Sequence, residues 1–320
     1  MSGNKNTKLA LLFPGQGSQY IGMGKEFLKS NPESRALMEK AESISGLPLK
    51  RLCLEGPMEE MTQTVNLQPA FTVTNLICLQ AVKKAGIKPD FVAGHSLGEY
   101  AALCAADSLS PENTLTLVSE RGRLMDREAE KHPGGMAAVL GLNLDDVLEI
   151  INGLSGDGVI SAANHNSKLQ IVISGERSAI EEATAAVVEK GGKVIVLKVS
   201  GAWHCNLIQD AVADFSAAME KVAFHPPSIP LLFNVTAEVE TDVDEIRRIM
   251  ARQIASMVKW HNIINNLADK GVRTFIEVGP GKVLTKLLKR ILPRDIKYTG
   301  LQIDNPETLD NSLAKINDEW

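Results

Sequence analysis

The clearest chemical signal in the chain is the pentapeptide 94–98, Gly-His-Ser-Leu-Gly. The apolar run 91–94 leads into it and the Ala- and Leu-rich stretch 96–106 follows, which predicts a strand, a tight turn and a helix. The glycines would permit close backbone contact and expose the Ser96 hydroxyl at a helix N-terminus, where free N–H groups favour developing negative charge. A chance match to Gly-x-Ser-x-Gly is the alternative, but the predicted strand and helix favour a serine nucleophile.

A serine nucleophile needs a base that accepts its proton, and the chain has six histidines. His95 is adjacent to Ser96, but neighbours on a tight turn point apart. His204 lies where the chain leaves a predicted inserted unit and returns to the larger pattern, so it is the best placed of the six. The others are interpreted as surface or core histidines: His132, His165, His225 and His261. No aspartate or glutamate stands out as the third member of a triad.

One arginine of the predicted helix 110–131 is expected to point toward the protein interior. The apolar stripe of this helix consists of Leu115, Val118, Gly122 and Met125. Arg121 flanks the stripe, whereas Arg123 and Arg127 fall on the opposite face. Because an unpaired buried charge is costly, Arg121 needs an anionic partner. The residues leave open a structural ion pair or a guanidinium that binds a substrate carboxylate.

Two glycine-bearing turns follow predicted strands. The segment 13–19, Phe-Pro-Gly-Gln-Gly-Ser-Gln, is not a dinucleotide-binding fingerprint, because Tyr20 stands where the third glycine is required. A simple turn and a loop that offers a backbone N–H to an oxyanion both remain open. The segment 279–282, Gly-Pro-Gly-Lys, is not a phosphate loop, because Val283 replaces the required Ser or Thr.

The predicted helix 281–291 has one basic side and one apolar side. The basic side carries Lys282, Lys286, Lys289 and Arg290. The apolar side carries Leu284, Leu287, Leu288 and Ile291. A solvated face is the simpler interpretation, and a docking patch for an acidic partner is the alternative.

The elements that must position these residues alternate along the chain. Short apolar runs predict strands at 9–13, 91–94, 231–235, 274–278 and 297–302. Helical patterns are found at 19–29, 33–45, 68–85, 96–106, 110–131, 207–222, 243–256, 283–291 and 306–316. Strands that alternate with helices predict an α/β fold with a mostly parallel sheet covered on both faces.

A second pattern interrupts the first one after the break His-Pro-Gly-Gly at 132–135. Strands are expected at 136–142, 159–163, 170–174 and 194–199, and helices at 144–154 and 179–190. The order β-α-β-β-α-β is typical of a ferredoxin-like unit. We therefore expect a small inserted domain over residues 133–199.

Composition narrows the class of protein. A chain of 320 residues suits one large α/β domain with a smaller one attached. The net charge of −5 argues against wholesale nucleic-acid binding. The polar N-terminus and the short apolar run after it predict neither a signal peptide nor a membrane span, so a cytoplasmic protein is expected. The cysteines lack C-x-x-C spacing, which predicts free thiols and no zinc site: Cys53, Cys78, Cys104 and Cys205.

Taken together and in this order, the motifs resemble those of malonyl-CoA:acyl carrier protein transacylases. The matching segments are 13–19, Gly-His-Ser-Leu-Gly-Glu-Tyr at 94–100, Ser-Glu-Arg-Gly at 119–122, Trp-His at 203–204, Arg-Gln at 252–253 and Glu-Val-Gly-Pro-Gly-Lys-Val-Leu at 277–284. The resemblance runs from about residue 8 to residue 292. It implies an α/β-hydrolase-like large subdomain, 1–132 with 200–320, and a ferredoxin-like small subdomain, 133–199.

The resemblance also implies roles for individual residues. Ser96 would carry the malonyl group as an ester, with His204 as its general base and later its general acid. Arg121 would hold the malonyl carboxylate. The family needs no aspartate as a third catalytic member, which agrees with the absence of a convincing candidate.

Further roles follow from the same resemblance. The backbone amides of Gln16 and Leu97 would form the oxyanion hole. Gln253 would lie beside the histidine, where a main-chain carbonyl orients the imidazole. Two segments depart from the family: Trp203 is bulkier than the usual residue there, which favours malonyl over methylmalonyl, and 164–170 lacks the usual proline and glycine.

The expected reaction is a ping-pong transfer from malonyl-CoA to the phosphopantetheine thiol of acyl carrier protein, which supplies fatty acid synthesis. CoA is the first product, and no metal or redox cofactor, no nucleic acid and no membrane is implied. Three alternatives remain: a serine esterase or thioesterase on the same scaffold, a malonyltransferase of a polyketide pathway, and a carrier-protein-binding module without activity.

Overall fold

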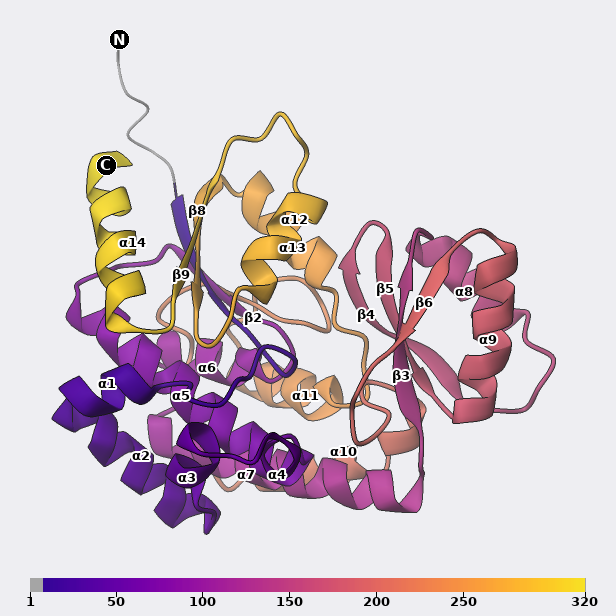
Figure 1. Ribbon diagram of the computed structural model, residues 1–320, viewed down its shortest axis with the longest axis horizontal. Helices are drawn as coiled ribbons and strands as arrows, with labels where there is room; N and C mark the ends of the chain where they lie inside the picture. Colours follow the sequence, from indigo (N-terminus) through magenta and orange to yellow (C-terminus); the bar gives the residue numbers. More distant parts are fainter. Residues whose placement is uncertain (1–7, 320) are drawn as a thin grey trace.

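The computed structural model describes residues 8–319 and shows an α/β protein with two separate sheets (Figure 1). The larger sheet has the strand order β7-β2-β1-β8-β9, and every neighbouring pair in it is parallel. Its strands are β1 (Lys8–Phe13), β2 (Phe91–Gly94), β7 (Leu231–Leu232), β8 (Val272–Val278) and β9 (Thr299–Ile303). The predicted mostly parallel sheet is confirmed. Residues 1–7 and 320 of the predicted large subdomain lie outside the described residues.

The central strand β1 shows why both faces of this sheet are covered. Leu9, Leu11 and Phe13 pack into one apolar core, whereas Ala10 and Leu12 pack into a second core on the other face. Successive side chains of a strand point to opposite faces, so a continuous apolar run is buried on both. The first core includes α5 (Thr64–Lys84), α6 (Gly98–Ala105) and α7 (Pro111–Lys131), and the second includes α12 (Trp260–Asp269) and α13 (Val283–Ile291).

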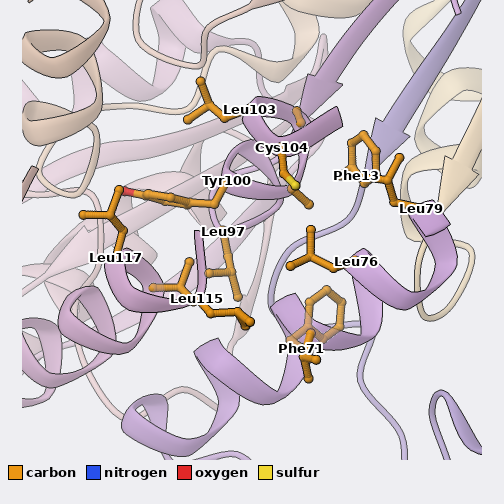
Figure 2. Close-up of a cluster of buried hydrophobic side chains, with 14 of the residues drawn as sticks. Phe13, Phe71, Leu76, Leu79, Leu97, Tyr100, Leu103, Cys104, Leu115 and Leu117 are labelled. Carbon is orange, nitrogen blue, oxygen red and sulfur yellow. The ribbon is translucent and has the colours of Figure 1, made fainter. Parts of the chain in front are cut away.

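Figure 2 shows how the first core ties three helices to the sheet. Phe13 of β1, Phe71 of α5 and Tyr100 of α6 are fully buried there, and Leu115 of α7 packs in the same cluster. The start of α7 follows the predicted signals, because Pro111 is its first residue and the Ser110 hydroxyl accepts from the amide of Asn113. This packing fixes α6 and α7 relative to the end of β2.

The smaller sheet is antiparallel and has the strand order β4-β5-β3-β6. Its strands are β3 (Gly135–Leu140), β4 (Ile160–Ser167), β5 (Gln170–Gly175) and β6 (Lys193–Val196). The helices α8 (Leu144–Asn152) and α9 (Arg177–Glu189) cover the face that points away from the larger sheet (Figure 1). The predicted order of elements, β-α-β-β-α-β, is confirmed.

Several helices differ from the prediction. The helix expected at 19–29 begins only at Lys25, because Gly22 and Gly24 adopt left-handed φ angles of 100° and 77°. The helix expected at 207–222 is divided into a 3₁₀ turn and a shorter helix, α10 (Ala211–Met219), and three helices were not predicted: α3 (Leu49–Leu54), α4 (Met58–Met61) and α12. The bounds not yet given are α1 (Lys25–Ser30), α2 (Pro32–Ser45), the 3₁₀ turn Asn206–Ile208, α11 (Val243–Gln253) and α14 (Pro306–Glu319).

The polar segment between the strands predicted at 159–163 and 170–174 is mostly extended. β4 continues to Ser167, and a two-residue turn leads directly into β5. The amide of His165 donates to the carbonyl oxygen of Val258, and the amide of Val258 donates to that of Ala163. Pairing with a segment about 90 residues away keeps this polar stretch extended, a contact that local sequence patterns do not report.

The four cysteines are free and buried, as their spacing predicts. None of the helices within residues 8–319 is long and apolar enough to span a membrane.

Candidate active site

Ser96 lies in a tight turn between β2, which ends at Gly94, and α6, which begins at Gly98. Its φ of 51° is a left-handed conformation that residues other than glycine rarely adopt. A Cβ on Gly98 would lie 2.0 Å from the carbonyl oxygen of Phe13, and one on Gly94 would lie 2.1 Å from the carbonyl carbon of Gly98. Only glycines therefore permit this turn, and the surrounding contacts must hold Ser96 in its strained conformation.

His204 is the histidine that reaches Ser96, with 2.7 Å between its Nε2 and the serine Oγ. Its Nδ1 lies 2.9 Å from the carbonyl oxygen of Gln253 and 3.0 Å from that of Ser256. Since both carbonyls can only accept, Nδ1 carries the proton and Nε2 is left to accept from the hydroxyl. No carboxylate in the described part of the chain bonds to His204.

The charge state of His204 follows from its surroundings. Burial lowers the pKa of His204 to about 3, and the positive charge of Arg121 contributes to the shift. The imidazole is therefore neutral at physiological pH, the form in which it can accept a proton. An anion bound to Arg121 would cancel part of the shift and make proton transfer to His204 easier.

Arg121 projects from α7 into the same space and is fully buried. Its Nη1 donates to Oε1 of Gln68 at 2.8 Å, and its Nη2 lies 3.1 Å from Oε1 of Gln253 and 3.3 Å from Oγ of Ser96. Within residues 8–319 it forms no ion pair, and its Nε has no hydrogen-bond partner. Of the two interpretations of this arginine, the structural ion pair is therefore not found.

Gln16 lies in the loop after β1, and Leu97 lies in the serine turn itself. Gln16 follows β1 and lines the cavity beside Ser96, and Leu97 immediately precedes α6. The loop of Gln16 packs closely on the turn, because a Cβ on Gly15 would lie 2.4 Å from the carbonyl oxygen of His95. The side-chain amide of Gln16 donates to Oγ1 of Thr64, but neither the backbone N–H of Gln16 nor that of Leu97 donates a hydrogen bond to another described residue. Both N–H groups are thus free to bind an oxyanion.

A cavity of about 170 Å³ opens beside Ser96 and receives residues from both sheets. The smaller sheet contributes Met136 and Asn166, the chain after it contributes Trp203, and α13 contributes Leu284. Nε2 of His95 lies 2.8 Å from Oδ1 of Asn166, which connects the serine turn to the smaller sheet. The cavity thus lies where the two sheets meet, with the hydroxyl of Ser96 at its wall.

Comparisons with known proteins agree with this geometry. Residues 10–304 match the acyl transferase domain family. The chain is 38% identical over 315 residues to the malonyl CoA-acyl carrier protein transacylase of Bacillus subtilis, an alignment that covers 98% of both chains. The chain belongs to the malonyl CoA-acyl carrier protein transacylase family. The corresponding protein of Staphylococcus aureus strain COL is 38% identical over 302 residues, 92% of this chain and 96% of its own.

Solved structures of this transacylase family superpose over almost the whole chain. FabD from Acinetobacter baumannii has a TM-score of 0.93 and 35% identity, and the alignment covers 98% of this chain and 99% of FabD. A malonyl-transacylase in complex with its type II PKS acyl-carrier protein, PlMCAT:AntF, has a TM-score of 0.92 and 30% identity, covering 97% of this chain and 100% of that one.

The structure adds three residues to the site that the motifs did not select. Gln68 of α5 bonds to Arg121, Asn234 accepts from the amide of Ser96, and Glu99 of α6 bonds to both Asn234 and Gln253. Two of them carried a weak signal in the sequence, because Asn234 directly follows the apolar run 231–233 and Glu99 precedes the apolar run 100–106, whereas Gln68 stands among other polar residues of its helix. That signal indicates burial but does not identify the partner.

His95 lines the same cavity as the Ser96–His204 pair, but none of the other described histidines and none of the possible metal ligands forms a hydrogen bond to Ser96 Oγ or to the His204 ring. His165 and His261 stack with 4.6 Å between ring centroids. Among the described residues, one group of three possible metal ligands comes together, Glu128, His132 and Asp210. The Glu128 carboxylate in this group is already paired with Arg127 and Lys131, both basic neighbours on α7. The expectation that no metal takes part stays a prediction.

Proposed function

We propose that this protein transfers a malonyl group from malonyl-CoA to the phosphopantetheine thiol of an acyl carrier protein, in the service of fatty acid synthesis. The observation that carries the proposal is a Ser96–His204 pair, 2.7 Å apart, beside a buried arginine without an ion pair. Nη2 of Arg121 lies 3.3 Å from the serine oxygen, so a carboxylate on that guanidinium would bring a short acyl group to the nucleophile.

The first half-reaction would form the acyl-enzyme. Malonyl-CoA binds with its carboxylate on Arg121, and His204 Nε2 takes the proton of Ser96 as the serine oxygen attacks the thioester carbon. The oxyanion is stabilised by the amides of Gln16 and Leu97, donors whose removal typically costs about 10²–10³ in rate. The C–S bond then breaks, and CoA leaves with the proton that His204 returns.

The second half-reaction would reverse these roles. The phosphopantetheine thiol gives its proton to His204 and attacks the malonyl-Ser96 ester. The C–O bond breaks, and His204 returns the proton to the serine oxygen. The carbonyl of Gln253 keeps the imidazole in the required tautomer in both halves.

The rival reaction is hydrolysis on the same scaffold. A serine hydrolase usually has an acidic residue behind its histidine, whereas here main-chain carbonyls occupy that place. A polyketide pathway would use the same chemistry with a different carrier, as the name of PlMCAT:AntF illustrates. If water discharged labelled malonyl-Ser96 faster than a carrier thiol, the hydrolase would be the better assignment.

The carrier protein would dock on α13. The side of this helix that carries Lys282, Lys286 and Lys289 is exposed, whereas Leu284 and Leu287 of the same helix line the cavity. An acidic carrier bound to this basic face would hold its phosphopantetheine arm at the cavity mouth. The docking interpretation of this face is favoured over a merely solvated one by its position beside Ser96.

The two sheets would belong to two subdomains. The parallel sheet supports the α/β-hydrolase-like assignment of 1–132 with 200–320, and the strand order β4-β5-β3-β6 supports the ferredoxin-like assignment of 133–199. A cytoplasmic location and the lack of any cofactor other than the CoA substrate complete the proposal.

Mass spectrometry after incubation with malonyl-CoA tests the proposed function. We expect a malonyl adduct on Ser96 that is absent in Ser96→Ala and much reduced in Arg121→Ala. An adduct on another residue, or no adduct at all on the wild-type protein, would overturn the mechanism.

A further inference from the structure

Glu99 is a buried carboxylate that the proposed chemistry does not use. It lies in the first turn of α6, three residues after Ser96, and is fully buried. Within residues 8–319 it forms no ion pair, and neither of its oxygens touches the Ser96 hydroxyl or His204. Burial raises the pKa of the Glu99 carboxyl group to about 8, although hydrogen bonds from Asn234 and Gln253 and the charge of Arg121 oppose the shift. Burying this group is costly, so its position requires a reason.

The first oxygen of Glu99 holds the residue that fixes the Ser96 amide. Oε1 accepts from the backbone N–H of Asn234 at 2.6 Å. The Asn234 side chain then bridges the turn: its Oδ1 accepts from the amide of Ser96 at 2.6 Å, and its Nδ2 donates to the carbonyl oxygen of Gly94 at 2.6 Å. Glu99 thereby places Asn234 across the strained turn.

The second oxygen holds the residue that fixes both the Ser96 carbonyl and Arg121. Oε2 of Glu99 accepts from Nε2 of Gln253 at 2.7 Å, and the same nitrogen donates to the carbonyl oxygen of Ser96 at 2.8 Å. Both partners can only accept here, so the amide nitrogen of Gln253 must face them. Its Oε1 is consequently turned toward Arg121, whose Nη2 lies 3.1 Å away.

We propose that Glu99 is a positioning residue that holds Ser96 in its left-handed conformation and Arg121 in its substrate-binding orientation, through Asn234 and Gln253. Both main-chain polar groups of Ser96 are bound by these two side chains, which explains how its φ of 51° persists. Arg121 is oriented through an amide and not by a direct ion pair, so its charge remains available for the malonyl carboxylate. This inference rests on the proposed function.

Replacing Glu99 with glutamine is the sharpest test, because it keeps the size of the side chain. A glutamine has one acceptor oxygen, so its NH₂ group would face an N–H donor of either Asn234 or Gln253. The variant must therefore lose or reorient the hydrogen bond to one of these two residues. Glu128→Gln is the matched control: Glu128 is also fully buried, on α7, and bonds to Arg127 and Lys131.

Two reaction rates at Ser96 separate the effect of Glu99 on the serine turn from its effect on Arg121. Single-turnover acylation of Ser96 by malonyl-CoA uses both the serine turn and Arg121. Labelling of Ser96 by a neutral alkyl fluorophosphonate uses the serine turn alone. For Glu99→Gln we expect malonyl acylation to fall about 10²-fold, as small misplacements of reacting groups do, and labelling to fall by a smaller factor. For Glu128→Gln we expect both rates to stay within about twofold of wild type.

A double variant tests whether Glu99 acts through Gln253. Adding Glu99→Gln to Gln253→Ala should lower malonyl acylation much less than Glu99→Gln does in the wild-type protein, because the hydrogen bond between Glu99 and Gln253 is already lost. A purely structural role would give additive losses. Where Glu99→Gln yields too little folded protein, Glu99→Asp keeps the carboxylate but shortens its reach, and the same order of losses is expected.

Three results would overturn the inference. The Glu99→Gln variant could be acylated by malonyl-CoA at the wild-type rate, or it could lose malonyl acylation and fluorophosphonate labelling by the same factor. The Glu128→Gln control could also lose as much of both rates as Glu99→Gln does. Each leaves the proposed function intact as long as the wild-type protein forms malonyl-Ser96. Failure of the wild-type protein to form that adduct would instead remove the proposed function.

Discussion

At the scale of single residues, the site depends on an imbalance of charge. Arg121 is buried next to Ser96 with neutral partners only, Gln68 and Gln253. An isolated buried cation attracts an anion strongly because little solvent screens it. Burial is the main cause of the lowered pKa of His204, and the charge of Arg121 lowers that pKa further. Under the proposed function, one side chain would therefore serve both the choice of substrate and the charge state of the base.

Replacing Arg121 with alanine should lower malonyl-CoA acylation about 10²-fold, since charge-assisted hydrogen bonds to the carboxylate are lost. Acetyl-CoA, which has no carboxylate, should be affected far less. Quenched-flow acylation with both thioesters measures this. Arg123→Ala is the control, because Arg123 lies on the exposed side of α7 and pairs with Glu120. Equal losses for both thioesters would contradict the assignment of Arg121.

Trp203 is expected to limit the size of the acyl group. It is 4% exposed and lines the cavity immediately before His204, where a branched acyl chain would crowd its ring. Trp203→Ser should increase the rate with methylmalonyl-CoA relative to malonyl-CoA, measured as the ratio of kcat/KM values. Comparable rates with both thioesters, in the wild type and the variant alike, would rule the idea out.

The pH dependence of acylation should show the lowered pKa of His204. An ordinary histidine, with a pKa of 6.5, would lose activity as the pH falls through that value, whereas His204 should stay neutral down to about pH 3. Fluorophosphonate labelling should therefore stay flat between about pH 5 and about pH 7. In Arg121→Ala the inflection should move upward, because one cause of the shift is removed. An inflection near 6.5 in the wild-type protein would contradict this.

The lowered pKa of His204 also makes the stability of the folded protein depend on pH. Because the folded pKa of His204 is below the unfolded value of 6.5, the unfolded chain binds the proton more readily. His204 therefore makes the protein less stable as the pH falls from about 6.5 toward about 3.

At the scale of elements, the serine turn is a joint between β1, β2 and α6. The three segments approach so closely that Gly94 and Gly98 have no space for a side chain. The pentapeptide motif made this turn predictable from sequence. Asn234, which accepts from the Ser96 amide, was not predicted, because it is 138 residues away from Ser96. The family resemblance placed Gln253 beside the histidine, but its hydrogen bond to the Ser96 carbonyl, across 157 residues, was not predicted.

Gly98→Ala should destroy this joint. Its new Cβ would lie 2.0 Å from backbone oxygen of Phe13, an atom that cannot move aside as a flexible side chain could. We expect a loss of about 1–3 kcal/mol in unfolding free energy and a large loss of Ser96 labelling. Gly135→Ala is the control, since its nearest atom, Cδ1 of Ile180, lies 3.9 Å away. Urea unfolding and fluorophosphonate labelling that match the control would contradict the steric argument.

At the scale of the whole molecule, the cavity exists because two sheets meet. The larger sheet brings Ser96 to its carboxyl edge, and the smaller sheet closes the cavity with Met136 and Asn166. α13 lies at this junction, where Arg290 donates to Gln170 at the start of β5. The arrangement of the two sheets thus places the basic face of α13 at the mouth of the cavity.

Charge reversal on α13 should weaken the binding of the carrier protein more than the binding of the CoA substrate. In Lys286→Glu/Lys289→Glu we expect the KM for acyl carrier protein to rise severalfold and to depend less on salt, because attraction between opposite charges is lost. Steady-state kinetics at two ionic strengths measure this. Lys25→Glu/Lys29→Glu on α1 is the matched control, on exposed lysines of a helix far from α13 (Figure 1). An unchanged KM for the carrier would place docking elsewhere.

The features that depend on neighbouring residues were predictable from the sequence. These are the serine turn, the inward phase of Arg121, the parallel sheet and the β-α-β-β-α-β order. The order of the motifs along the sequence also indicated the family. Such features follow from turn sterics and from the period of apolar residues, which are local properties.

Contacts between distant groups depend on the tertiary structure. The sequence ranked His204 as the best placed of six histidines and the resemblance assigned it as the base, but the distance of 2.7 Å between its Nε2 and Oγ of Ser96, across 108 residues, is a result of folding. Packing likewise decides that Arg121 forms no ion pair among residues 8–319 and that Glu99 bonds to both Asn234 and Gln253. A side chain's partner depends on the geometry of the whole core, and a local pattern of residues contains no information about it.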